Sequence, residues 1–418
     1  MSFTSVNKLF EASFKANWDR PAISNYQGET YHFRDIARKI EKLHIMFEEG
    51  GLEKGDKVAL CSRNQANWAI SFLATMTYGA VPVPLMHEFK PSNIHHLVNH
   101  SEAKVLFVDG GIWENLSETE MPDLQAIIQV DNFELLHSSN EAIVNARNCL
   151  NELFGRKFPK VFTSDCINYH EDKADELAII NYTSGTSGFS KGVMIPYRAV
   201  ASNLEFGRKV LPQINNTSRV VSMLPCAHMY GLMFEVLYEL SVGCHVHFLS
   251  RLPSPKIILQ ALSEVKPTVV IAVPLVIEKI YKIDLLGLVK DLLRGIMKTT
   301  NDKAGETSDS TDPADQATVA GAAAAYVLGV VEESDNTQTG ATAAIAALAE
   351  PDPSLDLSGG DSSNYTFKDI IVEILEGVSI NGTALSSIVD PEFIFLNLAS
   401  TAWMPGSLVS AVALNADR

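Results

Sequence analysis

Short apolar runs alternate with segments of helical periodicity in the first part of the chain. Between the runs, apolar residues recur three and four positions apart, as on one face of an amphipathic helix. Strands that alternate with helices of this length predict β-α-β units and a largely parallel sheet covered by helices on both faces. The pattern predicts strands at 57–61, 81–85, 104–109 and 126–130, and helices at 65–78, 91–100 and 132–149.

The stretches that flank this alternation are patterned as well. Residues 151–175 are predicted to be a polar connection. The N-terminal residues predict a helix at 4–17, two short strands within 22–33 about a Gln27-Gly28 turn, and a helix at 33–49 that is ended by Gly50 and Gly51.

A second alternation begins with the apolar run Leu177 to Ile180, which predicts a buried strand. Ser254 is predicted to cap the last helix of this series, with Pro255 at its first position. The series contains helices at 197–210, 229–240 and 254–265, and strands at 220–224, 245–249 and 268–273. We therefore expect a first α/β subdomain at 1–175, a second at 176–298, and a tail at 299–418.

The acidity of the chain is concentrated in this tail. The net charge is −17, yet residues 1–300 carry 32 acidic and 30 basic side chains, whereas residues 301–418 carry 18 acidic and 3 basic ones. Neither part predicts a basic surface, so nucleic acid is not an expected partner. Residues 299–366 are rich in Ala, Asp, Ser, Thr and Gly, which is typical of loose linkers.

Cysteine spacing and hydropathy bear on the compartment. The five cysteines show no C-x-x-C spacing, which is typical of reduced thiols in a cytosolic protein. The N-terminus has no apolar core of the signal-peptide type, and the sequence contains no apolar run of about 18 residues. We therefore expect a cytoplasmic protein without membrane spans.

Residues 181–193 read NYTSGTSGFSKGV and directly follow the strand predicted to begin at Leu177. The glycines allow positive φ angles and close approach of a ligand, and the hydroxyls lie beside backbone N–H groups. Such a loop suits a polyphosphate, and Lys191 adds a positive charge at its far end. The sequence matches neither the GK[ST] ending of a P-loop, nor the G-x-S-x-G elbow, nor the G-x-G-x-x-G fingerprint.

Tyr182 to Val193, YTSGTSGFSKGV, closely resembles the signature phosphate-binding loop of the adenylate-forming superfamily. The resemblance extends over about 16–282 and includes RPAISNYQGETYHFRDIARKIEKL, NWAISFLATMTYGAVPVPL, SMLPCAHMYGLMFEVLYELSVGCHV and KPTVVIAVPLVIEKI. The sequence is most similar to long-chain fatty acid-CoA ligases. The resemblance implies two stacked α/β subdomains with largely parallel sheets, as in the large N-terminal domain of these enzymes.

The same resemblance implies an activity. In the family, a carboxylate attacks the α-phosphate of ATP to give an acyl-adenylate and pyrophosphate, and coenzyme A then displaces AMP. The implied small molecules are a carboxylic acid (here a fatty acid), ATP, Mg²⁺ and coenzyme A. The hypothesis includes peripheral contact with a membrane, where a fatty acid would be collected. Two alternatives stay open: a catalytically deficient nucleotide- or acyl-binding remnant, and an acyl-AMP ligase that delivers to a carrier protein.

Site residues are implied by the two matching motifs. Residues implied to bind the ATP phosphates are Thr183, Ser184, Gly185, Thr186, Ser187, Gly188 and Lys191, and residues implied to line the acyl and carboxylate pocket are His228, Gly231 and Met233. Lys191 could instead be a solvated loop lysine, and His228 could instead be a histidine satisfied by a backbone carbonyl.

Other histidine pairs do not predict a metal site. His96 and His100 lie four residues apart on a predicted helix that also carries His95, but no carboxylate or cysteine has ligand spacing to them. His245 and His247 alternate on a predicted strand, with the same interpretation.

The resemblance ends near Lys282. The glutamate that helps to hold Mg²⁺ in the family, the aspartate that binds ribose and the catalytic lysine of the small C-terminal domain have no counterpart that we recognise in residues 283–418. The tail could be a divergent end, a fused foreign segment, or a sequence outside a natural reading frame.

Overall fold

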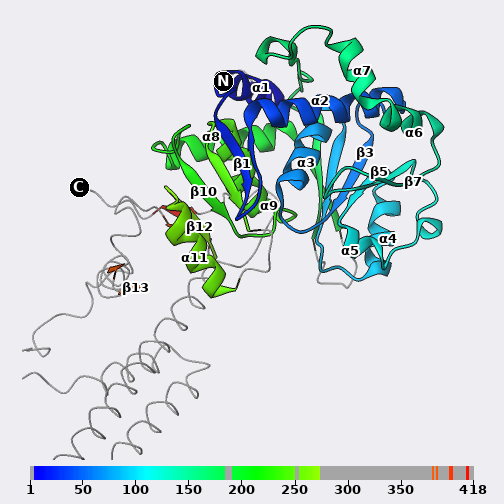
Figure 1. The fold of residues 1–418 in the computed structure, drawn as a ribbon. Coiled ribbons are helices and arrows are strands. Elements are labelled where there is room, and N and C mark those ends of the chain that lie inside the picture. The colour runs from blue at the N-terminus through cyan, green and yellow to red at the C-terminus, as the bar shows by residue number, and fades with distance from the viewer. Residues whose placement is uncertain are drawn as a thin grey trace, which may run out of the picture. The chain divides into compact units, whose positions relative to one another are not determined.

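The computed structural model describes residues 4–183, 191–249 and 254–273 and four short strands beyond them (Figure 1). These strands are β13 (Ser379–Ile380), β14 (Thr383–Ala384), β15 (Phe395–Leu398) and β16 (Ala411–Ala413). The chain divides into two compact units, Met1–Val273 with Glu376–Arg418, and Pro274–Leu375. All of the described residues belong to the first unit.

A five-stranded sheet with the order β4-β3-β5-β6-β7 occupies the first part of this unit. Its first four strands are parallel and β7 is antiparallel to β6. The strands are β3 (Lys57–Cys61), β4 (Val81–Leu85), β5 (Ala103–Val108), β6 (Ala126–Gln129) and β7 (Leu135–Ser138). The α/β fold predicted from the alternation is confirmed.

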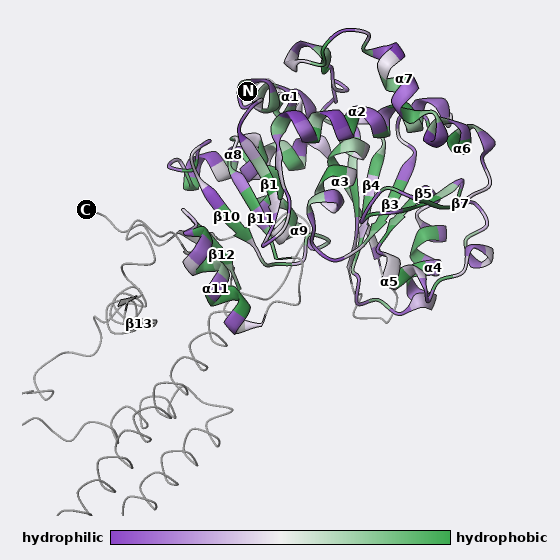
Figure 2. Ribbon diagram, in the orientation of Figure 1, coloured by the Kyte–Doolittle hydropathy of each residue, from purple (hydrophilic) through white to green (hydrophobic). Residues whose placement is uncertain are grey.

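Alternate residues of β3 enter different cores. Val58 and Leu60 pack in the cluster that contains apolar residues of α2 (Phe33–Glu49) and α3 (Ala66–Tyr78). Ala59 and Cys61 pack in a second cluster with residues of α4 (Pro91–His100). Because successive strand residues point to opposite faces, the sheet is covered on both sides. Figure 2 shows the strands largely green, for hydrophobic residues, and purple patches on α2.

A second sheet has the order β10-β11-β1-β2. Its strands are β1 (Pro21–Asn25), β2 (Thr30–His32), β10 (Arg219–Ser222) and β11 (His245–Phe248). β1 is parallel to β11, with Ile23 opposite Val246, so a strand near the start of the sequence lies within the later sheet. The division of the chain at residue 175 stays a prediction, although sheet membership does not follow it.

β8 (Leu177–Thr183) and β9 (Lys191–Pro196) pair with each other as an antiparallel hairpin, which is a two-stranded sheet of its own. Further along the chain, β12 (Val270–Ala272) pairs in parallel with β15, which is antiparallel to β16, and β13 pairs with β14. The β8–β9 hairpin packs on the first sheet through Ile180 and Tyr182, which lie in the same cluster as Val81 and Val83 of β4.

The predicted helices of the later part are present. Ser254 caps α11 by accepting a hydrogen bond from Ile257 N, with Pro255 at its first position, as predicted. The helices here are α8 (Tyr197–Val210), α9 (Met229–Gly231), the π-helix η3 (Leu232–Leu237), α10 (Tyr238–Ser241) and α11 (Pro255–Val265). None of the helices within the described ranges combines the length and the apolar character that crossing a bilayer requires.

Two predictions near the first sheet are wrong. Residues 132–149 form strand β7 and then α6 (Glu141–Asn148), which Asn140 caps, because β7 completes the sheet edge beside β6. The connection predicted at 151–175 contains α7 (Leu150–Lys157).

The remaining elements are α1 (Val6–Ala16), α5 (Gly110–Trp113), η1 (Glu118–Glu120) and η2 (Ser164–Cys166).

Candidate functional site

The β8–β9 hairpin carries the predicted phosphate loop at its open end. Thr183 and Lys191 are cross-strand partners in the last pair of the hairpin, and both are exposed. Of the other predicted phosphate-binding residues, Ser184, Gly185, Thr186, Ser187 and Gly188 lie outside the described residues. The hairpin therefore presents a hydroxyl and an ammonium group side by side where the loop begins and ends.

Asn181, two residues before the end of β8, connects the hairpin to a second loop. Its Nδ2 donates to the carbonyl of Ala227 at 2.9 Å, and the side chain is buried. Ala227 belongs to the segment that joins β10 to α9, here called the 223–228 loop. The loop that contains the predicted pocket histidine thus lies beside the strand that leads into the phosphate loop.

Glu235 holds the 223–228 loop from the π-helix. Its carboxyl group accepts hydrogen bonds from Met223 N (3.2 Å), from Leu224 N (3.0 Å) and from Ser222 Oγ (2.9 Å). The side chain is fully buried, and burial raises its pKa to about 8 although these donors oppose the shift. A single π-helical turn is often found where a functional residue is placed.

Asn64 holds the same loop from the segment between β3 and α3. Its Nδ2 donates to Leu224 O at 2.6 Å, and its Oδ1 accepts from Cys226 N at 2.9 Å. Three side chains from distant parts of the sequence therefore bond five backbone groups of residues 223–227. Buried backbone groups of an irregular loop need such partners.

His228 lies between strand and helix, as the sequence predicts, and is the N-cap of α9. Its Nδ1 accepts a hydrogen bond from Tyr230 N at 3.3 Å, which places the ring proton on Nε2 in the neutral form. The ring is exposed, yet desolvation by the surrounding protein lowers its pKa below the usual value. A neutral imidazole that carries its proton on Nε2 can donate a hydrogen bond from that atom to a carboxylate.

The other two predicted pocket residues are buried. A Cβ on Gly231 would lie 2.7 Å from Pro225 O and 3.1 Å from Leu224 Cβ, so the lack of a side chain lets the helix start pack against the 223–228 loop. Met233 is 4% exposed and belongs to the main core cluster. Contact of Gly231 and Met233 with an acyl chain stays a prediction.

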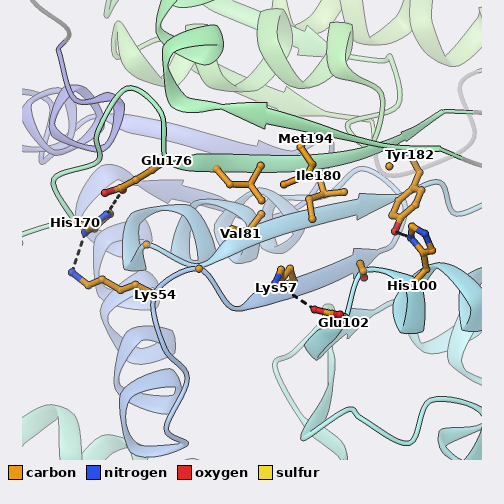
Figure 3. A pocket seen from close by; sticks show the side chains of 15 residues that line it. Lys54, Lys57, Val81, His100, Glu102, His170, Glu176, Ile180, Tyr182 and Met194 are labelled. Carbon is orange, nitrogen blue, oxygen red and sulfur yellow. Dashed lines mark hydrogen bonds and ion pairs between the residues drawn. The ribbon is translucent and has the colours of Figure 1, made fainter.

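A cavity of about 600 Å³ lies on the other face of the hairpin (Figure 3). Val81, Ile180 and Met194 form its apolar strip, and polar pairs lie at its ends. Lys54 Nζ lies 3.0 Å from His170 Nδ1, and His170 Nε2 lies 2.8 Å from Glu176 Oε2. The further pairs are Lys57 with Glu102 at 3.7 Å and His100 with Tyr182 at 2.7 Å.

This cavity is not the predicted site. Its lining includes neither Thr183 nor Lys191 nor His228. Its lysine, glutamate, histidine and tyrosine side chains are already paired with one another. We therefore place the candidate site at the hairpin end and the 223–228 loop.

Most of the remaining paired histidines have protein partners, although the buried Nε2 of His247 has no hydrogen-bond partner. His95 Nε2 accepts from Ser117 N at 3.1 Å, and His100 bonds the Tyr182 hydroxyl. His245 Nε2 lies 2.8 Å from Ser24 Oγ, and its ring centroid is 4.0 Å from that of His247. Over the described residues, no group of three or more histidine, cysteine, aspartate or glutamate side chains is placed to hold a metal ion.

Sequence reasoning missed Asn64, Asn181 and Glu235. A signal existed for Glu235, because an acidic residue interrupts the apolar run Leu232 to Leu237. Asn181 lies at the start of the glycine-rich stretch but precedes its hydroxyl residues. For Asn64 no local pattern was available, since its partners lie about 160 residues later in the sequence.

Comparisons with known proteins agree with the fold and with the family that the sequence resembles. The family described as AMP-binding enzyme matches residues 10–326, which extends past the residue where motif resemblance ends. A long-chain-fatty-acid–CoA ligase of Salmonella typhimurium is 25% identical over 259 residues, covering 58% of this chain and 46% of the relative. Long chain acyl-CoA synthetase 3 of Arabidopsis thaliana is 28% identical, covering 61% and 38%.

Solved structures support the same fold. ATP-bound MatB from Rhodopseudomonas palustris matches with a TM-score of 0.54 at 21% identity, covering 66% of this chain and 51% of that one. A red-emitting luciferase from Phrixothrix hirtus matches with a TM-score of 0.56 at 17% identity, covering 66% and 52%. The fold is that of the N-terminal domain of adenylate-forming enzymes.

The fold and the family match define an adenylate-forming type of protein. This chain belongs to the AMP-binding enzyme family. It spans less than half the length of the curated relatives described above, at 46% and 38%.

Proposed function

We propose that this chain binds ATP at the end of the β8–β9 hairpin and activates a carboxylic acid, a fatty acid, as an acyl-adenylate. The acid's carboxylate oxygen forms a bond to the α-phosphorus, and pyrophosphate leaves. The sulfur of coenzyme A then attacks the acyl carbon, forming a thioester and releasing AMP. The proposal places this reaction in the cytoplasm, with peripheral contact to a membrane that supplies the acid.

The observation that carries the proposal is the hydrogen bond from Asn181 to Ala227. It brings the strand that enters the phosphate loop next to the loop that presents His228. A nucleotide bound at the hairpin and a carboxylate near His228 would be neighbours. Holding two reactants side by side supplies much of the rate enhancement of such a reaction.

The described residues would act through charge and hydrogen bonding. Lys191 offers an ammonium group to the phosphates, where negative charge accumulates as pyrophosphate leaves. Neutral His228 offers Nε2–H to the substrate carboxylate without removing its charge, so the carboxylate remains a nucleophile. A protonated histidine would hold the carboxylate as an ion pair and lower its nucleophilicity.

Magnesium enters this proposal only with the nucleotide. Thr183, Lys191 and His228 provide no carboxylate ligand, and the residues that the structure describes do not fit a resident metal ion. Mg²⁺ prefers one or two carboxylates together with phosphate oxygens and water. We therefore derive no step through a metal that the chain itself holds.

Two rival functions remain, each with a distinguishing result. A remnant of the family would bind ATP without turnover. An acyl-AMP ligase would form the adenylate and leave free coenzyme A unused.

The test follows the free thiol of coenzyme A while ATP, Mg²⁺ and a fatty acid are supplied. Thiol loss that requires both ATP and the acid is the expected result. Formation of AMP-linked acid with no thiol loss would contradict the coenzyme A step. ATP binding without either product would contradict activation altogether.

A further inference from the structure

The backbone of residues 223–227 forms many hydrogen bonds with side chains from other parts of the chain. Asn64, Asn181 and Glu235 bond five of its backbone groups, and each side chain comes from a different element. Loops ordinarily leave such groups to water. Apolar packing alone would bury this loop without selecting one of its conformations. Directed hydrogen bonds select one conformation, because they form only in that geometry.

The conformation of this loop determines where the histidine lies. His228 N donates to Pro225 O at 2.9 Å, which closes a turn within the loop. Nδ1 of the same residue caps the helix that follows. Gly231 then packs against Pro225 O, so the loop and the helix start form one packed unit. A displacement of Leu224 or Cys226 would therefore move the imidazole.

We propose that Asn64 and Glu235 are positioning residues that clamp the 223–228 loop from two sides and fix His228 toward the carboxylate of the acid. The inference rests on the proposed function for its substrate but not for its geometry. Asn64 bonds both an acceptor and a donor of the loop backbone, because its one amide group donates to Leu224 O and accepts from Cys226 N. Glu235 supplies the acceptor on the opposite side.

Glu239 provides a matched control. It lies one turn after Glu235, is equally fully buried, and neither of its carboxyl oxygens has a hydrogen-bond partner. Replacing Glu239 by Leu thus removes a buried carboxyl from the same helical segment without removing a bond to the loop. Any effect of packing or charge alone should appear in both positions.

The clamp predicts which substitution of Glu235 is tolerated. Glu235→Gln keeps a carbonyl oxygen that can accept from Met223 N and Leu224 N, and its NH₂ can donate to Ser222 Oγ. Glu235→Leu keeps the volume but leaves both amides without an acceptor. Asn64→Ala removes the bonds on the other side, at a half-buried position where folding is less at risk.

The experiment measures the pKa of His228 by NMR titration of histidine-labelled full-length chain, with the signal assigned by its absence in His228→Asn. We expect a pKa below about 6.5 in the wild type, in Glu239→Leu and in Glu235→Gln. In Asn64→Ala and Glu235→Leu the loosened loop should weaken the desolvation of the ring by the surrounding protein and raise its pKa toward that value. The KM for the acid should rise about tenfold with little change in the KM for ATP.

Three outcomes would overturn the clamp. These are an unchanged His228 titration in Asn64→Ala, an equal shift in Glu239→Leu, or a rise in the KM for ATP matching that for the acid. If Glu235→Leu does not fold, Asn64→Ala with Glu235→Gln decides the question. If the wild type has no activity but the titration shifts as expected, the clamp stands and the proposed function fails.

Discussion

Asn181 and Tyr182 are neighbours on β8, and their side chains bond to opposite sides of the hairpin. Asn181 donates to Ala227 O at 2.9 Å, whereas the Tyr182 hydroxyl lies 2.7 Å from His100 Nδ1. The alternation of a strand thus separates the 223–228 loop from the cavity of Figure 3. The position of His228 depends on the first side, and the predictions below concern that side.

Lys191→Ala should weaken ATP binding. The exposed Lys191 is the cross-strand partner of Thr183, so the two residues flank the phosphate loop. Loss of a charged hydrogen bond to phosphate should raise the Kd for ATP by about 10- to 100-fold. Titration calorimetry measures this, with Lys160→Ala, at an exposed lysine elsewhere, as the control. Equal Kd values for both variants would remove Lys191 from the site.

Gly231→Ala should destabilise the protein. The added Cβ would meet Pro225 O at 2.7 Å, and a backbone atom cannot swing aside as a flexible side chain can. We expect a loss of about 1–3 kcal/mol in the free energy of unfolding. Chemical denaturation measures it. Gly155→Ala in α7 is the control, because its Cβ meets nothing within 4 Å, and it should gain about 0.5–1 kcal/mol.

Glu239→Leu should stabilise the protein, more so at higher pH. Burial and the nearby Glu235 raise the pKa of Glu239 well above its usual value. The unfolded chain then releases the proton near pH 4.3 while the folded protein retains it, so wild-type stability falls as pH rises above that value. The slope is about 1.4 kcal/mol per pH unit for each such group.

Denaturation of Glu239→Leu and wild type at pH 5, 6, 7 and 8 measures this difference. The gap between the two should widen steadily with pH. Glu235→Gln should flatten the wild-type slope in the same way, up to the pKa of about 8 for Glu235. Parallel stability curves for all three proteins would show that neither carboxyl group is buried in its protonated form.

Local patterns predicted most of the fold. The strand at Lys57–Cys61 and the cap at Ser254 follow from apolar runs and capping chemistry over a few residues. The edge strand Leu135–Ser138 was read as helix because its residues also suit a helical face, and only β6 beside it decides the matter. α7 was missed because its one aromatic residue, Phe154, packs on Phe162 from the following segment.

The candidate site was less predictable than the fold. Thr183, Lys191 and His228 follow from motifs, since glycine, hydroxyl and lysine spacing is local. The hydrogen bonds of Asn64 join residues about 160 positions apart, and no periodicity encodes such a pair. The pairing of β1 with β11 is equally non-local, because it joins Ile23 to Val246.

The central claim, activation of a carboxylic acid by ATP, is tested most directly by acid-dependent exchange of labelled pyrophosphate into ATP. The assay uses the full chain with Mg²⁺ and acids from acetate to long-chain fatty acids, and Lys191→Ala as the matched variant. We predict exchange that requires a fatty acid and falls in Lys191→Ala. No exchange with any acid, in a protein shown to be folded, would contradict the account.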